Sequence, residues 1–311
     1  MGGNVFFVFL AFSAAVFING ATDAANALTG PVACGAMKLS HAALLAACMN
    51  LLGMLLFSTL FPGVYETVSG LASFPPGTGG IAVTASLSAV VIWAGAAWIF
   101  GIPTSESHGL FAALAGTAFA LGAPVPDKIQ WAKVAAGLLF SVLGGGLSGY
   151  ITARSLRSHA KAHHWKGATI IGCAGTAFLH GAQDGQKFLG LMGAAGLLTR
   201  SRGAVFCCAI LMLCGTLLGG GRIVKKMGRE MADVDTFTAA CADMGSAVSL
   251  LAMTLAGLPV STTHVKMTAV ACAAGGAGRK TDRQVILQVI LAWITTFPGC
   301  FLLAYFITKL L

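Results

Sequence analysis

Charged residues are scarce in this sequence of 311 residues, at 9% of the chain, whereas 57% of the residues are hydrophobic. A soluble domain of this length carries about 25% charged residues. The deficit leaves too little polar surface for a water-soluble body, and several apolar stretches reach about 20 residues, the length that crosses a ~30 Å hydrocarbon core. Because an unpaired backbone group costs several kcal/mol in lipid, such stretches must be helical. The sequence therefore predicts an all-α polytopic membrane protein.

Signals of other protein classes are also missing. The nine cysteines form no C-x-x-C pair and lie mostly in apolar context, which predicts small buried side chains. The sequence has no nucleotide-binding loop, no cluster of metal ligands and no nucleophile–base pair in a soluble domain. We therefore predict that the chain is not an enzyme and uses no cofactor and no resident metal.

The net charge of +9 would suggest a nucleic-acid partner in a soluble protein. Here the basic residues lie in loops between apolar segments, so the positive-inside rule explains them and no nucleic-acid partner is expected. The first apolar stretch, from Asn4, lacks a basic region before it and runs into polar residues rather than a clean cleavage site. We therefore expect no removable signal peptide.

Ten hydrophobic elements divide the chain. Polar residues, glycine or proline interrupt several of them, so we expect broken or re-entrant helices among the ten. The elements cover roughly residues 4–29, 41–61, 81–100, 103–122, 131–153, 168–192, 204–221, 233–256, 259–277 and 284–308.

The basic residues favour one orientation of these ten elements in the cell membrane. With the N-terminus outside, twelve Lys and Arg residues fall inside and five fall outside, and the Gly/Pro-rich outer segment 62–80 carries none. We therefore expect a multi-pass protein with both termini extracytoplasmic. The inner set is Lys38, Arg154, Arg157, Lys161, Lys166, Arg222, Lys225, Lys226, Arg229, Arg279, Lys280 and Arg283, and the outer set is Lys128, Lys133, Arg200, Arg202 and Lys309.

An internal repeat organises the chain. Phe17-Ile-Asn-Gly-Ala-Thr-Asp23 matches Phe178-Leu-His-Gly-Ala-Gln-Asp184 at an offset of 161 residues. Gly101-Ile-Pro-Thr-Ser-Glu-Ser-His108 matches Gly257-Leu-Pro-Val-Ser-Thr-Thr-His264 at an offset of 156 residues. Chance rarely produces two motif pairs in the same order with nearly the same spacing.

Each half holds five hydrophobic elements, an odd number, so the second half must enter the membrane from the opposite side. This inverted-topology repeat is typical of secondary transporters, which bind substrate near the midplane where broken helices meet. We predict one transporter domain, residues 1–311. It consists of a first repeat (1–153), a basic cytoplasmic linker (154–166) and a second repeat (167–311).

The second motif pair predicts two helix N-termini rich in hydroxyl groups. Pro103 and Pro259 suit the start of a helix rather than its interior. The hydroxyls that follow lie where a helix exposes unpaired N–H groups and a partial positive charge. Two such ends that meet across a pseudo-two-fold axis would bind a tetrahedral oxyanion; the alternative is that the hydroxyls only cap their own helices. These hydroxyl segments contain Ser105 and Ser107, and Ser261, Thr262 and Thr263.

The first motif pair places one aspartate in a hydrophobic element of each half. A carboxylate at membrane depth is costly and is by default a functional candidate. Asn19, Asp23 and Asn26 share one helix face and form an all-oxygen set suited to a hard cation. We predict a coupling-ion site from these three residues and Asp184, with a structural ion pair as the alternative for the two aspartates.

The second copy of this motif differs in its chemistry. His180, Asp184 and Lys187 take the positions of Asn19, Asp23 and Asn26. Lys187 follows Asp184 by three residues and could pair with it on one helix face. The first half is therefore suited to a cation, and the second half carries a cation of its own.

Five further residues carry weaker hypotheses. Glu106 could accept a hydrogen bond from the protonated oxygen of phosphate, which sulfate lacks, or cap its helix. Lys266 could attract anions or neutralise a carboxylate, and Asp243 could relay protons or pair with Lys187 or Lys266. His108 and His264 are expected to be packing groups rather than proton carriers.

These motifs resemble those of the inorganic phosphate transporter (Pit) family, bacterial type, in which G-x-x-D-x-A-N-A recurs in each half. The first copy here is Gly20-Ala-Thr-Asp-Ala-Ala-Asn-Ala27, and the second is the variant His180-Gly-Ala-Gln-Asp-Gly-Gln-Lys187. The resemblance covers nearly the whole chain. It implies an inverted-repeat fold with phosphate between the hydroxyl segments and a coupling ion near the two aspartates. Thr22, Gln183 and Lys187 depart from the family pattern.

We predict a symporter that moves inorganic phosphate across the cell membrane, driven by a proton or sodium gradient. The substrate-binding residues would be the hydroxyl segments with Glu106, the two aspartates and Lys187. A sulfate or other oxyanion permease on the same fold is the alternative, and an anion channel is the alternative of another class. The lipid bilayer is the expected environment, and the sequence does not decide between a monomer and a homodimer.

Overall fold

The computed structural model describes residues 2–23, 25–123, 128–161, 164–197, 201–219, 221–226 and 230–311. Within these ranges the chain is helical apart from its loops and one isolated antiparallel bridge between Ala232 and Thr281. This confirms the all-α prediction. The helices are α1 (Gly2–Thr22), α2 (Ala25–Ala33), α3 (Leu39–Leu60), α4 (Gly63–Ser69), α5 (Gly79–Phe100), α6 (Glu106–Ala120), α7 (Lys128–Leu156), α8 (Trp165–Ala194), α9 (Arg202–Leu218), α10 (Gly221–Lys225), α11 (Thr236–Leu255), α12 (Thr262–Ala277) and α13 (Arg283–Leu310), with the 3₁₀ turn η1 (Arg157–His159).

Six of these segments are long and apolar enough to cross a membrane by length and composition, and α9 is a shorter apolar helix of 17 residues. Helices α6 and α12 have 15 and 16 residues. The six are Val5–Ala33, Leu39–Leu60, Gly79–Phe100, Lys128–His159, Thr236–Leu255 and Arg283–Leu310. Helix α8 has 30 residues, and its polar residues Asp184 and Lys187 are buried inside the bundle. The ten predicted elements therefore all correspond to helical segments.

Broken helices occur where the sequence predicted interruptions. The first element, 4–29, divides into α1 and α2, so that Asp23 lies at the break. Elements 103–122 and 259–277 begin as extended chain, and their helices start only at Glu106 and Thr262.

Two boundaries were wrong. The Gly/Pro-rich segment 62–80, which lay between two predicted elements, contains α4, and element 204–221 ends early, with α10 as a separate short helix. α4 and α10 occupy equivalent places in the two halves, so the repeat is more complete than the hydrophobic pattern shows. Helix α4 has only 7 residues and α10 only 5, and both are too short to show a periodic hydrophobic pattern in the sequence.

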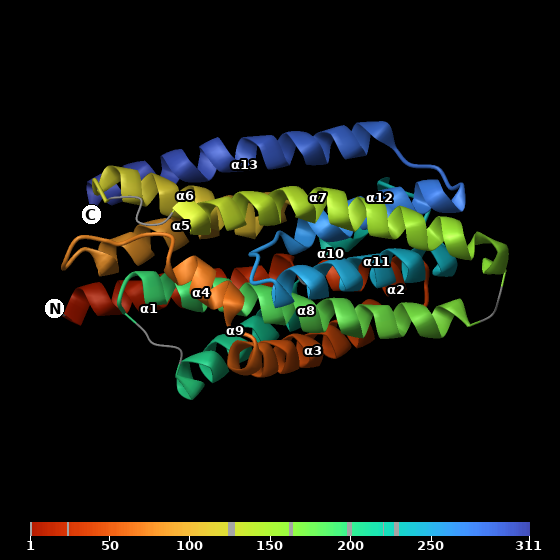
Figure 1. Ribbon diagram of the computed structural model, residues 1–311, viewed down its shortest axis with the longest axis horizontal. Coiled ribbons are helices and arrows are strands. Elements are labelled where there is room, and N and C mark those ends of the chain that lie inside the picture. The colour runs from red at the N-terminus through yellow and green to blue at the C-terminus, as the bar shows by residue number, and fades with distance from the viewer. Residues whose placement is uncertain are drawn as a thin grey trace.

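The two halves are inverted relative to each other. In Figure 1, α1 starts at the end of the bundle that holds both termini, and α8 runs back from the opposite end, where η1 lies. Helices α6 and α12 both start near the middle of the bundle and run to opposite ends. The inverted-repeat prediction is thereby confirmed, including broken helices at the centre.

The halves also exchange packing partners. Gly20 on α1 and Gly215 on α9 each lie so close to the backbone of the other helix that an added side chain would overlap it. Gly53 on α3 and Gly181 on α8 lie in the same way against each other's helices. Helix α1 thus packs on α9 of the second half as well as on α5 of its own half, and α8 packs on α3 of the first half as well as on α11 of its own. Small residues allow such approach of helix backbones in lipid, where van der Waals packing replaces the hydrophobic drive for association.

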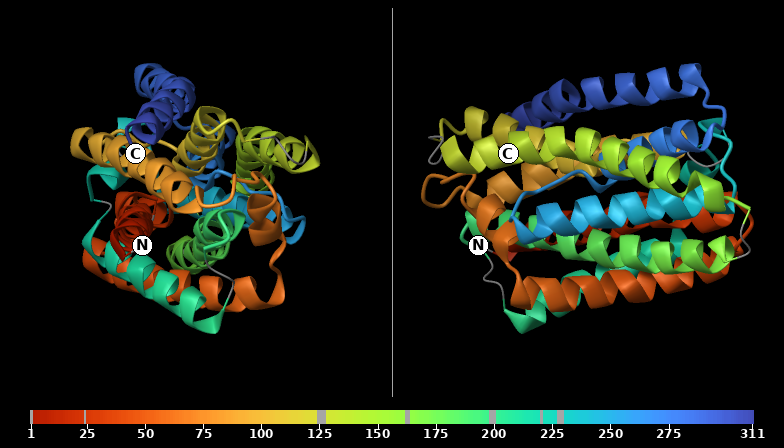
Figure 2. Two further views of the ribbon diagram at one scale, coloured as in Figure 1. Left: turned by 90° about the vertical axis from the view of Figure 1, so that its left-hand side faces the viewer. Right: turned by 45° about the vertical axis from the view of Figure 1, so that its right-hand side comes forward.

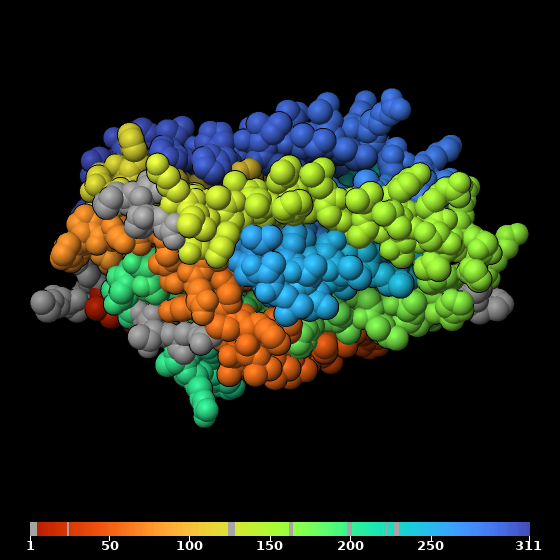
Figure 3. Space-filling view, viewed as in Figure 1, coloured from red at the N-terminus to blue at the C-terminus, as the bar shows by residue number. Residues whose placement is uncertain are grey.

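The last helix of each half follows the same rule. α7 packs against α12 and α11, with Gly149 close to Gly245 and Ala269, and α13 packs against α6 and α5. Figure 3 shows α7 and α11 side by side on one face, and Figure 2 shows α13 along the outside of the bundle. Because each half supplies the packing surface of the other, the two repeats form a single bundle.

The cysteine prediction is only partly confirmed. Four cysteines are buried, but three are exposed on the outer surface of the bundle, among exposed large apolar side chains. This surface is expected to face lipid, so an apolar context there does not require burial in protein. The buried residues are Cys173, Cys208, Cys241 and Cys300, and the exposed ones are Cys48, Cys207 and Cys214.

Candidate functional site

The two hydroxyl segments meet at the centre of the bundle. Ser105 and Ser261 are the N-caps of α6 and α12, and each side chain accepts a hydrogen bond of 3.1 Å from the backbone N–H of the histidine three residues later. The Ser105 hydroxyl also donates to the Ser261 hydroxyl at 2.7 Å. The capping role and the predicted meeting of two helix N-termini are therefore both observed.

Glycine turns direct these segments into the centre. Gly101 ends α5 and Gly257 ends α11, each with a backbone φ of 66° that L side chains rarely adopt. The chain leaves each helix there, runs extended through a proline and starts the next helix at the cap serine. The G-x-P-x-S spacing thus determines where the two hydroxyl segments lie.

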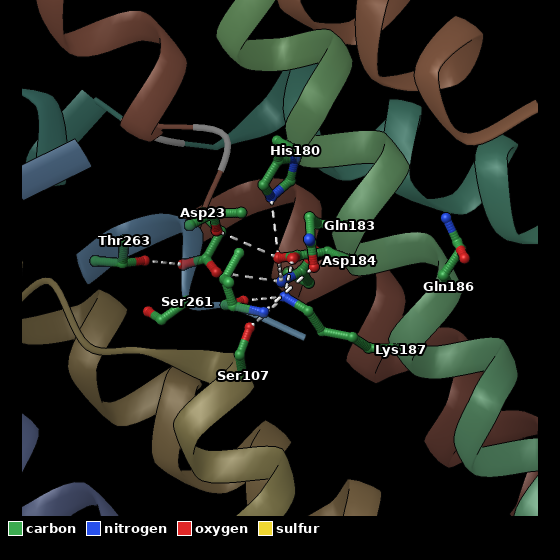
Figure 4. Close-up of polar contacts among 12 residues, drawn as sticks. Asp23, Ser107, His180, Gln183, Asp184, Gln186, Lys187, Ser261 and Thr263 are labelled. Carbon is green, nitrogen blue, oxygen red and sulfur yellow. Dashed lines mark hydrogen bonds and ion pairs between the residues drawn. The ribbon is translucent and has the colours of Figure 1, made fainter. Parts of the chain in front are cut away.

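The break between α1 and α2 lies beside the second hydroxyl segment. Thr263 donates a hydrogen bond of 2.9 Å to Asp23 (Figure 4). The Asn26 amide donates one of 3.0 Å to Thr263. Asn19 donates to Asp184 at 3.0 Å and to Asp23 at 3.4 Å, so that one amide bridges the two aspartates. The carboxylates of the two halves therefore share one site.

The second copy of the motif contacts the first hydroxyl segment. The Lys187 ammonium group lies 2.5 Å from the Asp184 carboxylate, 2.6 Å from the Ser107 hydroxyl and 2.5 Å from the Val260 carbonyl oxygen. Asp184 also contacts the His180 ring at 3.3 Å, and Thr262 donates to it at 3.5 Å. The predicted pairing of Lys187 with Asp184 is confirmed.

Glu106 completes the polar centre. Its Oε1 accepts a hydrogen bond from the Thr22 hydroxyl, while Oε2 is buried without a hydrogen-bond partner among the described residues. The site then contains three carboxylates, of Asp23, Glu106 and Asp184, and one ammonium group, of Lys187. With all four ionised the formal charge is −3 + 1 = −2, which an anion meets unfavourably unless cations enter with it.

The site is closed to solvent. Every side chain of the predicted site is buried, and the Asp23, Asp184 and Lys187 side chains are at most 3% exposed. A cavity of about 10 Å³ adjoins Thr22 and Asp23 on the side of Trp98 and Ile223. Ligand atoms of Asp23, His180 and Asp184 lie within 4.8 Å of one another, a grouping that could hold an ion.

The structure decides two hypotheses that the sequence left open. Lys266 and Asp243 form an ion pair with both side chains fully buried, so Lys266 neutralises a carboxylate and Asp243 is not a partner of Lys187. His108 and His264 pack edge to face with ring centroids 5.8 Å apart, and His264 also lies against Trp293. The two histidines therefore pack among aromatic rings.

Three supporting residues were missed. Asn50 contacts the far side of the His180 ring at 3.0 Å, and Gln183 donates to the Leu258 carbonyl oxygen at 3.1 Å and accepts from the Val260 N–H. Ser141 accepts from the Ser261 N–H at 2.9 Å. Each is a polar side chain inside an apolar element, a signal that would have identified them because such groups face a bundle interior.

The comparison with protein-family models decides the family. The model described as phosphate transporter family matches residues 19–166 and 153–304. The chain belongs to this phosphate transporter family. The match confirms the resemblance drawn from the four motifs and the prediction of a membrane transporter rather than an enzyme.

Curated relatives of this phosphate transporter family member extend over most of its length. A protein of Bacillus subtilis named probable low-affinity inorganic phosphate transporter is 28% identical over 95% of the chain and 94% of its own length. A Rhizobium meliloti protein of the same name is 29% identical over 93% and 90%. The Escherichia coli low-affinity inorganic phosphate transporter PitB is 32% identical, over 56% of the chain and 42% of its own length.

A solved structure shares the fold. It is described as a sodium-dependent phosphate transporter, superimposes with a TM-score of 0.83 at 17% identity, and the match covers 100% of this chain and 99% of that one. The agreement over the whole length confirms the architecture of two inverted repeats with broken helices.

Proposed function

We propose that this family member is a symporter that carries inorganic phosphate together with a proton or a sodium ion. The observation that carries the proposal is the composition of the buried centre: two hydroxyl-rich helix N-termini suited to an oxyanion lie against three carboxylates and one ammonium group. With its four charged groups ionised, the dry site has a formal charge of −2, and a phosphate ion cannot enter it without compensation. Cations bound at the carboxylates supply it, which couples the two fluxes.

The hydroxyl segments would bind phosphate when the tips of α6 and α12 move apart. The donors are Ser105, Ser107, Ser261, Thr262 and Thr263, with free N–H groups of the first helical turns. Because Ser105 and Ser261 are now in contact at 2.7 Å, the described conformation is closed, and a ligand between them needs a relative movement of the two halves. Asp23, Asn26, Asn19 and Asp184 would hold the coupling ion.

Reconstituted protein in liposomes tests this function. Uptake of radiolabelled phosphate is measured while sodium and proton gradients are imposed separately, and one of them should drive accumulation above equilibrium. A channel would only dissipate the phosphate gradient.

Arsenate should compete with phosphate for uptake, since it carries a proton near pH 7. Sulfate should not compete, because the buried acceptor of Glu106 would remain unpaired at a cost of ~1–3 kcal/mol or more. Strong competition by sulfate would favour the alternative, a sulfate permease.

Removal of single hydroxyls should weaken phosphate binding. Ser105→Ala, Ser107→Ala, Ser261→Ala and Thr263→Ala each remove one donor to a charged ligand, at a cost of ~1.5–3 kcal/mol, about 10-fold or more in affinity. Competition binding of phosphate to purified variants measures the change. Ser249→Ala, outside the site, is the control and should bind normally. Normal affinity in all four variants would exclude the hydroxyl segments from the site.

The orientation is also a proposal. We propose that the termini are extracytoplasmic and that residues 154–166 form the cytoplasmic linker. This segment lies at the end of the bundle opposite the termini (Figure 1), and it carries Arg154, Arg157, Lys161 and Lys166. On a background without the native cysteines, Ser158→Cys should resist a membrane-impermeant thiol reagent in intact cells. Leu311→Cys, at an exposed position, should react readily. If Leu311→Cys resisted the reagent and Ser158→Cys reacted, the orientation would be the opposite of the proposed one.

A further inference from the structure

We propose that the Lys187 ammonium group is a tethered cation that permanently fills the second of two symmetry-related cation sites, so that transport exchanges only the cation of the first site. This inference rests on the proposed function for its link to coupling, but the occupied site itself is a feature of the described residues. It concerns how many cations accompany each phosphate.

The inverted repeat relates the two sites residue by residue. Asn26 and Lys187 are 161 positions apart, the offset of the first motif pair, and Thr263 and Ser107 are 156 apart, the offset of the second. Asn26 contacts Thr263 at 3.0 Å, and Lys187 contacts Ser107 at 2.6 Å. Each half of the site thus joins the break-helix motif of one repeat to the hydroxyl segment of the other.

The surroundings of the Lys187 nitrogen are those of a small cation. Its three neighbours are a carboxylate oxygen of Asp184, the hydroxyl oxygen of Ser107 and the backbone carbonyl oxygen of Val260, at 2.5 to 2.6 Å. Hard cations prefer oxygen ligands of these kinds. The side chain is 1% exposed, so the charge cannot exchange with solvent ions.

The same contacts argue against Lys187 as a direct ligand of phosphate in this conformation. An ammonium group has three N–H donors and no acceptor, and the three oxygen neighbours use all of them. Lys187 therefore acts through Asp184, whose negative charge it cancels. Asp23 in the first half has no lysine or arginine partner among the described residues: its side-chain hydrogen bonds come from the hydroxyl of Thr263 and the amide of Asn19.

Sodium binding to the purified protein tests the inference without phosphate. Lys187→Asn restores the residue type of the first half and removes the tethered charge. This variant should bind one more ²²Na⁺ per chain than the unmodified protein at equilibrium, and its unfolding temperature should become sodium-dependent. Lys187→Arg keeps the charge and should bind no additional sodium. The reciprocal variant Asn26→Lys should fill the first site and bind one ion fewer, or none.

The number of cations exchanged per phosphate can also be measured by transport. With a tenfold gradient of the driving cation, one exchanged cation sets a limit of about tenfold phosphate accumulation, beyond any contribution of the membrane potential, and two set about a hundredfold. The unmodified protein should therefore show a first-order dependence on this cation. A second-order dependence would overturn the inference even if Lys187→Asn did not fold. So would a folded Lys187→Asn variant that loses phosphate affinity without binding additional sodium, since Lys187 would then be a phosphate ligand. Absence of phosphate transport, with sodium binding as expected, would instead overturn the proposed function.

Discussion

Asp23→Asn is expected to abolish gradient-driven phosphate accumulation while leaving phosphate exchange across the membrane. Asp23 lies at the break between α1 and α2, accepts a hydrogen bond of 2.9 Å from Thr263 and has no basic residue as a described contact. An amide of nearly the same shape keeps the contact but removes the charge that holds a cation. The accumulation ratio should fall from well above one to about one, because the neutral amide no longer attracts a cation and each contact to the former carboxylate, worth roughly 1.5–3 kcal/mol while charged, weakens to roughly 0.5–1.5 kcal/mol.

The measurement compares two assays on the same proteoliposomes. Net uptake against a phosphate gradient requires the coupling cation, whereas exchange of labelled for unlabelled phosphate does not require its release. Asp233→Asn is the control. This carboxylate is 63% exposed and pairs with Arg279 on the surface, so its loss should change neither stability nor coupling by much. Retained accumulation in Asp23→Asn would remove Asp23 from the coupling site.

Asp184→Asn is expected to reduce the amount of folded protein strongly. Asp184 is the carboxylate partner of Lys187 at 2.5 Å, and both side chains are 1% exposed. Loss of one partner leaves an uncompensated buried charge, which costs ~3–5 kcal/mol. The free energy or temperature of unfolding in detergent, together with the yield in the membrane, measures the effect.

A double variant separates folding from function. Asp184→Asn combined with Lys187→Met removes both charges, and replacement of a whole buried pair is often close to neutral for stability. We expect the double variant to recover most of the lost stability. If Asp184→Asn alone is as stable as the unmodified protein, the pair contributes no buried charge compensation. If Asp23→Asn and Asp184→Asn behave alike in every assay, the two halves are functionally symmetric.

The motifs predicted which residues meet at the buried centre because their signals are local in sequence. A carboxylate within an apolar run, as at Asp23 and Asp184, is costly in the membrane and is therefore recognised as a functional candidate from the sequence alone. A proline followed by serine marks the start of a helix, and Ser105 and Ser261 do cap α6 and α12. The odd number of elements in each half then fixed the inversion without any knowledge of packing.

Short and irregular segments were not predictable in this way. α4 and α10 lack the length for a periodic pattern, and residues 62–80 therefore lay between two predicted elements. The pairing of Lys266 with Asp243 also stayed open, because helices α12 and α11 can place these residues together only through their packing. The exposed cysteines show a further limit: apolar sequence does not distinguish a lipid-facing side chain from one buried in protein.

The sequence by itself determined the membrane class, the inverted repeat and the identity of most side chains at the centre. The tertiary structure decided which half each of them contacts. Asn26 meets Thr263, 237 residues away, and Lys187 meets Ser107, 80 residues away in the other repeat. The physical reason is the exchange of packing partners: glycine-lined helices of each half lie closest to the other half, and this brings the motif of one repeat to the hydroxyl segment of the other.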